Sequence, residues 1–339
     1  MNQTEDIRKL LDDNKTIVIL QADNPDGDSL ASALALEQIF HDMGKVPHMY
    51  CGVDMPKHLR HLPGWDRVVK DIPHSFDISI MVDCSSKSLF EAAERNGQLS
   101  WVLAKPTIIL DHHNVETTFQ PTVNLNDHTA VATGEVIYDL AKKLDWPLDI
   151  HAMNMITVSI LSDSLGLMTT GTTAKSIRTI AELVDAGVNL PELDEARRET
   201  MRKSEELVRY KGELLGRIEY HHDTEIATVT IPWEDIEKYS SSYNPSILVL
   251  EDMRLTEGTK LAIAFKVYNN GNRITAKIRC NYGNPIGKEL AEHFGGGGHP
   301  YASGFKVIGR PFNEVKSECI ELAHELLDKL KMEQTDAVI

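Results

Sequence analysis

The chain of 339 residues carries 35 lysines and arginines against 51 aspartates and glutamates, which gives a formal net charge of −16. Hydrophobic residues make up 42% and charged residues 25%, the proportions of an ordinary globular protein, so extensive disorder is excluded. So acidic a chain repels a long phosphate backbone, which excludes a protein that coats duplex nucleic acid but not one that holds a small anion beside a metal ion.

Length, hydropathy and cysteine spacing indicate how many domains the chain forms and in which cellular compartment it is expected. One core rarely grows beyond about 250 to 300 residues, so the length predicts two domains. The four cysteines are far apart and never form a C-x-x-C pair, which indicates neither a disulfide framework nor a zinc ribbon and fits a reducing compartment. No run of about 18 apolar residues occurs, so we expect a cytoplasmic protein without membrane contact.

The first half of the chain alternates apolar strands with helices. Strands are predicted over 16–20, 78–82 and 107–110, and helices over 30–43, 132–143, 152–162 and 174–186. This alternation predicts an α/β fold with a mostly parallel, doubly wound sheet covered by helices on both faces. Such sheets bind ligands beyond the carboxyl ends of their strands, so the polar residues after each strand are expected to meet at one edge.

The second half of the chain has a different periodicity. Alternating apolar residues over 225–231 and 260–268 are typical of antiparallel strands, and Asn270-Gly271 predicts a type I′ hairpin. Helices are predicted over 287–294 and 312–332. We expect an N-terminal domain over 1–190, a charged helical linker over 191–216 and a smaller α+β domain over 217–339.

Carboxylates follow the first two predicted strands. Asp26 and Asp28 flank Gly27, which we interpret as permitting a tight bend. Two carboxylates this close repel unless a cation lies beside them, but a turn followed by a helix cap explains them equally well. Asp83 follows the second strand, where an aspartate more commonly caps or turns the chain.

The third strand is followed by Asp111-His112-His113. Packing does not explain this motif, because a core needs neither two adjacent imidazoles nor the carboxylate before them. Imidazole with several carboxylates and no thiolate favours Mn²⁺ or a similar octahedral ion over structural zinc. Asp163 ends a predicted apolar helix, where the helix dipole disfavours a carboxylate and so favours a functional role.

The second domain contains a candidate anion site. Gly295–Gly298 follow a predicted helix, and glycines leave backbone N–H groups free to approach an anion, while His299 adds a donor. Arg279 follows a predicted strand over 274–278, and its guanidinium can pair with a phosphate, although a single arginine more often forms a surface ion pair.

These motifs resemble those of a known family in order and spacing, over nearly the whole chain. The segments are Asn24-Pro25-Asp26-Gly27-Asp28, Val82-Asp83, Asp111-His112-His113, Ser162-Asp163, Gly295-Gly296-Gly297-Gly298-His299 and Tyr301-Ala302-Ser303-Gly304-Phe305. They resemble the DHH phosphoesterases, and within them the DHH–DHHA1 group of NrnA-like oligoribonucleases, pAp phosphatases and dinucleotide phosphodiesterases. The resemblance implies a DHH catalytic domain followed by a DHHA1 substrate-binding domain.

The resemblance also implies roles for single residues. Two Mn²⁺ ions are expected, with Mg²⁺ as the alternative ion. The implied metal ligands, with Asp83 bridging, are Asp26, Asp28, Asp83, His112 and Asp163. His113 is placed near the scissile phosphate, so His113 and Asp83 are the expected catalytic residues. The implied substrate-binding residues are Arg279, Gly296, Gly297, Gly298 and His299.

One position departs from the family. Its members usually have a histidine ligand four residues before the first motif aspartate, where this chain has Ala22. Alanine cannot coordinate a metal ion, and strand alternation turns Gln21 and Asp23 the other way. One of the two metal sites is therefore expected to be weakened.

The leading hypothesis is a metal-dependent hydrolase, a phosphoesterase with exonuclease-like action on short oligoribonucleotides, linear dinucleotides or pAp. The rivals are a nucleotide-binding regulatory protein with a weakened catalytic centre, which Ala22 supports, a manganese-dependent inorganic pyrophosphatase, and a RecJ-like exonuclease. The net charge of −16 favours substrates of two or three nucleotides. The sequence leaves the choice of nucleotide and the oligomeric state open, a homodimer included.

Overall fold

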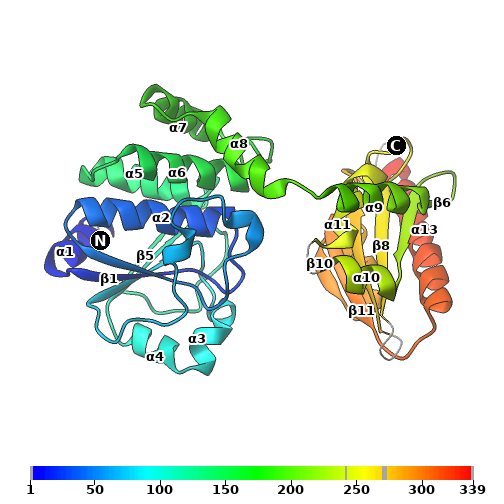
Figure 1. The fold of residues 1–339 in the computed structure, drawn as a ribbon, viewed down its shortest axis with the longest axis horizontal. Helices are drawn as coiled ribbons and strands as arrows, with labels where there is room; N and C mark the ends of the chain where they lie inside the picture. The colour runs from blue at the N-terminus through cyan, green and yellow to red at the C-terminus, as the bar shows by residue number, and fades with distance from the viewer. Residues whose placement is uncertain (1–2, 241–242, 269–272, 337–339) are drawn as a thin grey trace. The chain divides into compact units, whose positions relative to one another are not determined.

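The computed structural model describes residues 3–240, 243–268 and 273–336, with side chains to residue 333. The chain forms two compact units, Met1–Arg202 and Lys203–Ile339, and each has its own sheet (Figure 1). Among the described residues, we find no helix with both the length and the apolar content that a membrane span requires.

The first unit is built on a five-stranded parallel sheet with strand order β2-β1-β3-β4-β5. Its strands are β1 (Thr16–Leu20), β2 (Val46–Tyr50), β3 (Ile78–Val82), β4 (Thr107–Asp111) and β5 (Val123–Asn126). β3 and β4 are buried along their whole length, as their continuous apolar sequences require. The predicted parallel α/β sheet is confirmed.

Helices pack on both faces of this sheet. They are α1 (Gln3–Asp13), α2 (Gly27–Asp42), α3 (Glu91–Arg95), α4 (Gln98–Leu103), α5 (Thr133–Leu144), α6 (Ile150–Asp163), α7 (Ala174–Asp185) and α8 (Leu190–Met201). Three short 3-10 turns lie at Lys57–Leu59, Trp65–Arg67 and Lys87–Leu89. Ile17 and Ile19 of β1 join the core with α2, α5 and α6, whereas Val18 and Leu20 join α3 and α4. Figure 1 shows these two groups of helices on opposite faces of the sheet.

Two glycines allow α2, α5 and α6 to approach closely. A Cβ on Gly27 would meet Oγ of Ser162 at 2.0 Å, and one on Gly134 would meet Oγ of Ser159 at 2.1 Å. Gly27 is the first residue of α2 and has no positive φ. The expectation that Gly27 permits a tight bend is therefore wrong, because the absence of its side chain makes room for α6.

The second unit contains a six-stranded mixed sheet with order β10-β11-β9-β8-β7-β6. Its strands are β6 (Glu219–His221), β7 (Ile226–Ile231), β8 (Leu261–Tyr268), β9 (Arg273–Cys280), β10 (Gly297–His299) and β11 (Ala302–Val307). β8 and β9 pair antiparallel with Tyr268 opposite Arg273. The predicted turn at Asn270-Gly271 lies outside the described residues.

The relative direction of β7 and β8 differs from the prediction. The alternation over 225–231 and 260–268 indicated antiparallel strands, but β7 pairs parallel with β8. The connection explains this, because α10 (Trp233–Tyr239) and α11 (Pro245–Arg254) return the chain to the end of the sheet at which β7 began.

Helices cover both faces of the second sheet. α9 (Glu205–Gly216), α10 and α11 pack against β7 and β8, while α12 (Gly287–His293) and α13 (Phe312–Asp336) pack on the opposite face. The predicted connection over 191–216 forms two helices, α8 in the first unit and α9 in the second. The many charged residues indicated a linker without a core contribution, but α9 buries Leu207, Tyr210 and Leu214 along one side.

Candidate metal centre

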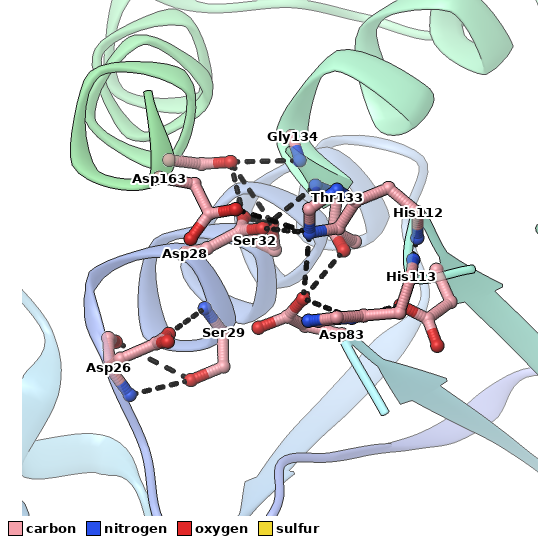
Figure 2. A network of polar contacts seen from close by, with 12 residues as sticks. Asp26, Asp28, Ser29, Ser32, Asp83, His112, His113, Thr133, Gly134 and Asp163 are labelled. Carbon is pink, nitrogen blue, oxygen red and sulfur yellow. Dashed lines mark hydrogen bonds and ion pairs between the residues drawn. The ribbon is translucent and has the colours of Figure 1, made fainter. Parts of the chain in front are cut away.

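Several polar residues singled out in the first unit converge at the carboxyl edge of its sheet. The strand order reverses between β1 and β3, the place where open parallel sheets bind their ligands. Asp28 follows β1 and Asp83 follows β3. Both carboxylates lie beside His112, which follows β4, and Asp163 at the end of α6 lies beside Asp28 (Figure 2).

The Nε2 atom of His112 lies among three carboxylates. It is 3.3 Å from Oδ2 of Asp163. It is also 3.5 Å from Oδ2 of Asp28 and 3.5 Å from Oδ1 of Asp83. This buried nitrogen has no hydrogen-bond partner among the described residues. An unpartnered imidazole nitrogen facing three carboxylates fits a divalent cation with oxygen and nitrogen ligands.

Asp28 is fully buried and rigidly held at the start of α2. Its Oδ1 accepts hydrogen bonds from the hydroxyls of Ser32 and Ser159, and its Oδ2 accepts one from the backbone N–H of Thr133 at 2.8 Å. Burial raises the pKa of Asp28, and the charge of His112 opposes that rise. The ordered donors around this carboxylate come from α2, α5 and α6.

Asp83 occupies a left-handed backbone conformation with φ of 57°. Such a conformation costs a non-glycine residue roughly 1 to 3 kcal/mol, and aspartate is among the residues that tolerate it best. Its Oδ1 accepts a hydrogen bond from Oγ1 of Thr133 at 3.1 Å. Burial, followed by the charges of Asp28 and Asp26, raises the pKa of Asp83 well above its usual value. A bound cation would offset this cost.

Asp163 is the most exposed of the converging carboxylates, with 36% of its side chain accessible. Burial, followed by the charge of Asp28, raises the pKa of Asp163. α6 ends at Asp163, so its carboxylate stands at the negative end of the helix dipole. Neither the dipole nor the neighbouring carboxylates favour the ionised form, so this position suits a carboxylate that binds a cation.

Asp111 contacts His113 and orients its ring at the border of the cluster. It is fully buried, and its Oδ1 lies 2.8 Å from Nδ1 of His113 while its Oδ2 accepts a hydrogen bond from Ser85. The contact with Asp111 raises the pKa of His113, whose side chain is half exposed. Nδ1 of His113 is also 3.6 Å from Oδ1 of Asp83, so the ring borders the cluster. A carboxylate in this position fixes the ring orientation.

Asp26 does not join the cluster of close ligand atoms. Its carboxylate accepts the backbone N–H of Ser29 at 3.0 Å, and its own N–H donates to Oγ of Ser29 at 2.9 Å (Figure 2). This capping box begins α2. The charge of Asp26 still contributes to the raised pKa values of Asp83 and Asp163, so Asp26 lies close enough to act on them.

Position 22 supplies no ligand. Ala22 is 5% exposed in the apolar core beside α3 and α4, and its carbonyl accepts a hydrogen bond from Sγ of Cys51. Oδ2 of Asp23 accepts the backbone N–H of Ala92 in α3 at 2.8 Å, whereas its Oδ1 is buried without a hydrogen-bond partner among the described residues. Gln21 is fully buried, and neither atom of its amide has a hydrogen-bond partner among the described residues.

Sequence reasoning missed the hydroxyl residues that support the ligands. Thr133 donates to both Asp28 and Asp83, and Ser159 donates to Asp28. The available signal was the pair Thr133-Gly134 at the start of a predicted helix, where a hydroxyl and a missing side chain occur together. Asp111 was noted only as part of its motif, without its supporting role.

The candidate anion site of the second unit has a different geometry from the expected free loop. Arg279 and Gly295–Gly298 line an open pocket of about 730 Å³. Gly297–His299 form the edge strand β10, which pairs antiparallel with β11. His299 is exposed and is not among the residues that line this pocket. Nη1 of Arg279 donates to the carbonyl of Ile278 at 2.9 Å.

Comparisons with known proteins match part of the first unit to a family model and most of the chain to curated relatives. Residues 16–172 match the family described as "DHH family, N-terminal domain". The bifunctional oligoribonuclease and PAP phosphatase NrnA of Thermus thermophilus is 24% identical over 308 residues, which cover 90% of this chain and 88% of the relative. The protein of the same description from Bacillus subtilis is 21% identical over 295 residues, which cover 86% and 89%.

Two solved structures share the fold. An exopolyphosphatase-related protein from Bacteroides fragilis matches with a TM-score of 0.80 and 18% identity, covering 97% of this chain and 96% of that one. RecJ from Thermus thermophilus in complex with Mn²⁺ matches with a TM-score of 0.50 and 15% identity, covering 96% of this chain and 55% of that one. These likenesses show that the two-unit architecture recurs in other proteins.

We predict that Asp83→Asn and His112→Ala each weaken Mn²⁺ binding by at least about 10-fold, because each removes a ligand atom from the cluster. Metal content after equilibrium dialysis, measured by mass spectrometry, checks this. His324→Ala is the matched control, since His324 belongs to a second cluster with Glu225 and Asp328 whose carboxylates already pair with lysines. Wild-type metal content in both cluster variants would contradict the assignment.

Proposed function

We propose that this chain, a member of the DHH family by the match over residues 16–172, is a divalent-metal-dependent phosphoesterase that hydrolyses phosphate esters of small nucleotides. The observation that carries the proposal is the convergence of three carboxylates on the unpartnered Nε2 of His112. The relatives named as oligoribonucleases and PAP phosphatases support nucleotides as the substrate class.

The proposed ion is Mn²⁺, with Mg²⁺ as the alternative. Its proposed ligands are Asp28, Asp83, His112 and Asp163. A second ion is proposed beside Asp26 and Asp83, and it is held more weakly because Ala22 offers no imidazole. When bound, divalent ions polarise a phosphoryl oxygen and make water a stronger nucleophile at neutral pH.

The residues of the chain prepare the site for that chemistry. His113 borders the cluster, and Asp111 holds its ring and favours the protonated form. We assign His113 to the scissile phosphate, where a positive imidazolium stabilises the negative charge that develops during attack. Asp83, held by Thr133 and a strained backbone, keeps its carboxylate in the same place throughout the reaction.

Substrate binding is assigned to the second unit. Arg279, Gly296, Gly297, Gly298 and His299 are the proposed contacts for the nucleotide. A net charge of −16 favours short substrates, because only the part of the substrate inside the site needs to meet positive charge. Exonuclease action on short oligoribonucleotides and a cytoplasmic location, which the four free buried cysteines support, complete the proposal.

A second candidate is a nucleotide-binding regulatory protein with a weakened centre. Ala22 favours it, because its side chain is packed in the core and offers no ligand. The supporting hydroxyls of Thr133 and Ser159 favour the enzyme, since a site without a cation has no need for carboxylates held this rigidly. The pyrophosphatase alternative has no specific observation in its favour.

We predict that metal-stripped protein hydrolyses pAp and the dinucleotide pApA only after Mn²⁺ is added, and that it leaves inorganic pyrophosphate largely intact. The reason is that the proposed contacts of the second unit fit a nucleotide. Phosphate or nucleotide release by chromatography is the measurement, with cyclic dinucleotides in the same panel. Turnover of pyrophosphate alone would contradict the proposed substrate class, and no turnover of any substrate would favour the regulatory candidate.

We predict that Ala22→His raises the number of Mn²⁺ ions bound per chain at limiting metal and raises the rate there, with a smaller gain at saturating metal. Imidazole suits the ion that this position would hold. Rate against Mn²⁺ concentration, together with metal content, checks it. If the wild type already binds two ions tightly and the histidine variant changes neither quantity, the weak-site proposal is wrong. Overpacking beside α3 would show separately, as a loss of about 1 to 3 kcal/mol in stability.

A further inference from the structure

Four cations, and no carboxylate of the described residues, line the open pocket of the second unit. The cations are Lys266, Lys277, Arg279 and Lys306. No carboxylate of the described residues forms an ion pair with any of them. Because the chain carries a net charge of −16, four cations gathered in one pocket without a carboxylate need another explanation.

The strand register places these cations on one face of the sheet. Along β9, the residues between Ile274 and Cys280 alternate, and Lys277 and Arg279 point away from the core that α12 and α13 cover. Lys266 of β8 and Lys306 of β11 both lie opposite Thr275 of β9, so they share that face. Lys277 and Arg279 are two residues apart, which separates them by about 6.6 Å along the strand.

Gathering these cations costs free energy in the absence of an anion. Burial lowers the pKa of Lys266, and repulsion from Lys277 lowers it further. Burial also lowers the pKa of Lys277, with added repulsion from Arg279. Each half-buried ammonium group therefore gains when a negative group enters the pocket, because the attraction replaces repulsion at short range.

The start of α11 adds a second and independent feature at the same end of the pocket as Lys266. α11 is followed directly by β8 and runs back along it, so the first turn of the helix lies near the last residues of the strand. Ser246 in that turn lines the pocket and is 1% exposed, and its hydroxyl has no hydrogen-bond partner among the described residues. A buried free hydroxyl at a helix N-terminus is suited to an anion.

We propose that Lys266, Lys277 and Ser246 form a subsite for a terminal phosphate monoester that is not cleaved. This subsite lies in the same pocket as the contacts assigned to Arg279 and the glycine segment and adds residues to them, and it rests on the proposed function for its role in turnover. The preferred substrates are then nucleotides that carry a phosphate monoester in addition to the bond that is hydrolysed.

The test is binding of AMP and of adenosine to the metal-free full-length chain by calorimetry. The wild type is expected to bind AMP more tightly than adenosine. Lys266→Gln and Lys277→Gln are each expected to weaken AMP binding by about 10- to 100-fold, because a charge-assisted hydrogen bond is lost, and to leave adenosine binding unchanged. Ser246→Ala should weaken AMP binding by a smaller factor. Lys288→Gln, which changes a lysine paired with Glu292 outside the pocket, is the control.

Activity separates failure of this inference from failure of the proposed function. With Mn²⁺ present, the lysine variants should raise KM for pApA and leave turnover of ApA unchanged. Equal binding of AMP and adenosine by the wild type, or unchanged AMP affinity in both lysine variants, would overturn the subsite whatever the activity. Hydrolysis of neither dinucleotide by the wild type, together with tight AMP binding that the lysine variants lose, would overturn the proposed function and keep the subsite.

Discussion

The burial of carboxylates around Nε2 of His112, with the repulsion that it strengthens, is the constraint on which the rest of the first unit depends. Asp28 and Asp83 are buried where like charges interact strongly, and both have raised pKa values. The surrounding structure holds them together through Thr133 and Ser159 and the close approach of α2, α5 and α6 that Gly27 and Gly134 permit. A divalent cation converts this arrangement from a cost into a binding site.

Much of the first unit follows from the sequence because parallel sheets obey strong rules. Strands that alternate with helices usually lie parallel, and the residues that follow their carboxyl ends then meet at one edge of the sheet. The proximity of Asp83 and His112 could therefore be predicted without knowledge of any contact between them. The relative direction of β7 and β8 was predicted wrongly because no comparable rule applied to them. Alternation with a period of two is shared by parallel and antiparallel strands, and the helices between the strands decide the direction.

The finer parts of the site depend on tertiary contacts that no local pattern encodes. Asp26 and Asp28 look equivalent in sequence, but Asp26 caps α2 while Asp28 is buried against α5 and α6. In the second unit, the alternation that places Lys277 and Arg279 on one face was visible in the sequence. That this face lines a pocket became clear only from the structure, in which α12 and α13 cover the opposite face of the sheet.

The central claim is that Asp28, Asp83, His112 and Asp163 hold a divalent cation, and anomalous X-ray diffraction from crystals grown with Mn²⁺ tests it most directly. We expect the strongest manganese peak within about 2.0 to 2.6 Å of Nε2 of His112 and of oxygens from these aspartates. No manganese peak at this cluster, with the strongest one at Glu225, His324 and Asp328 instead, would contradict it.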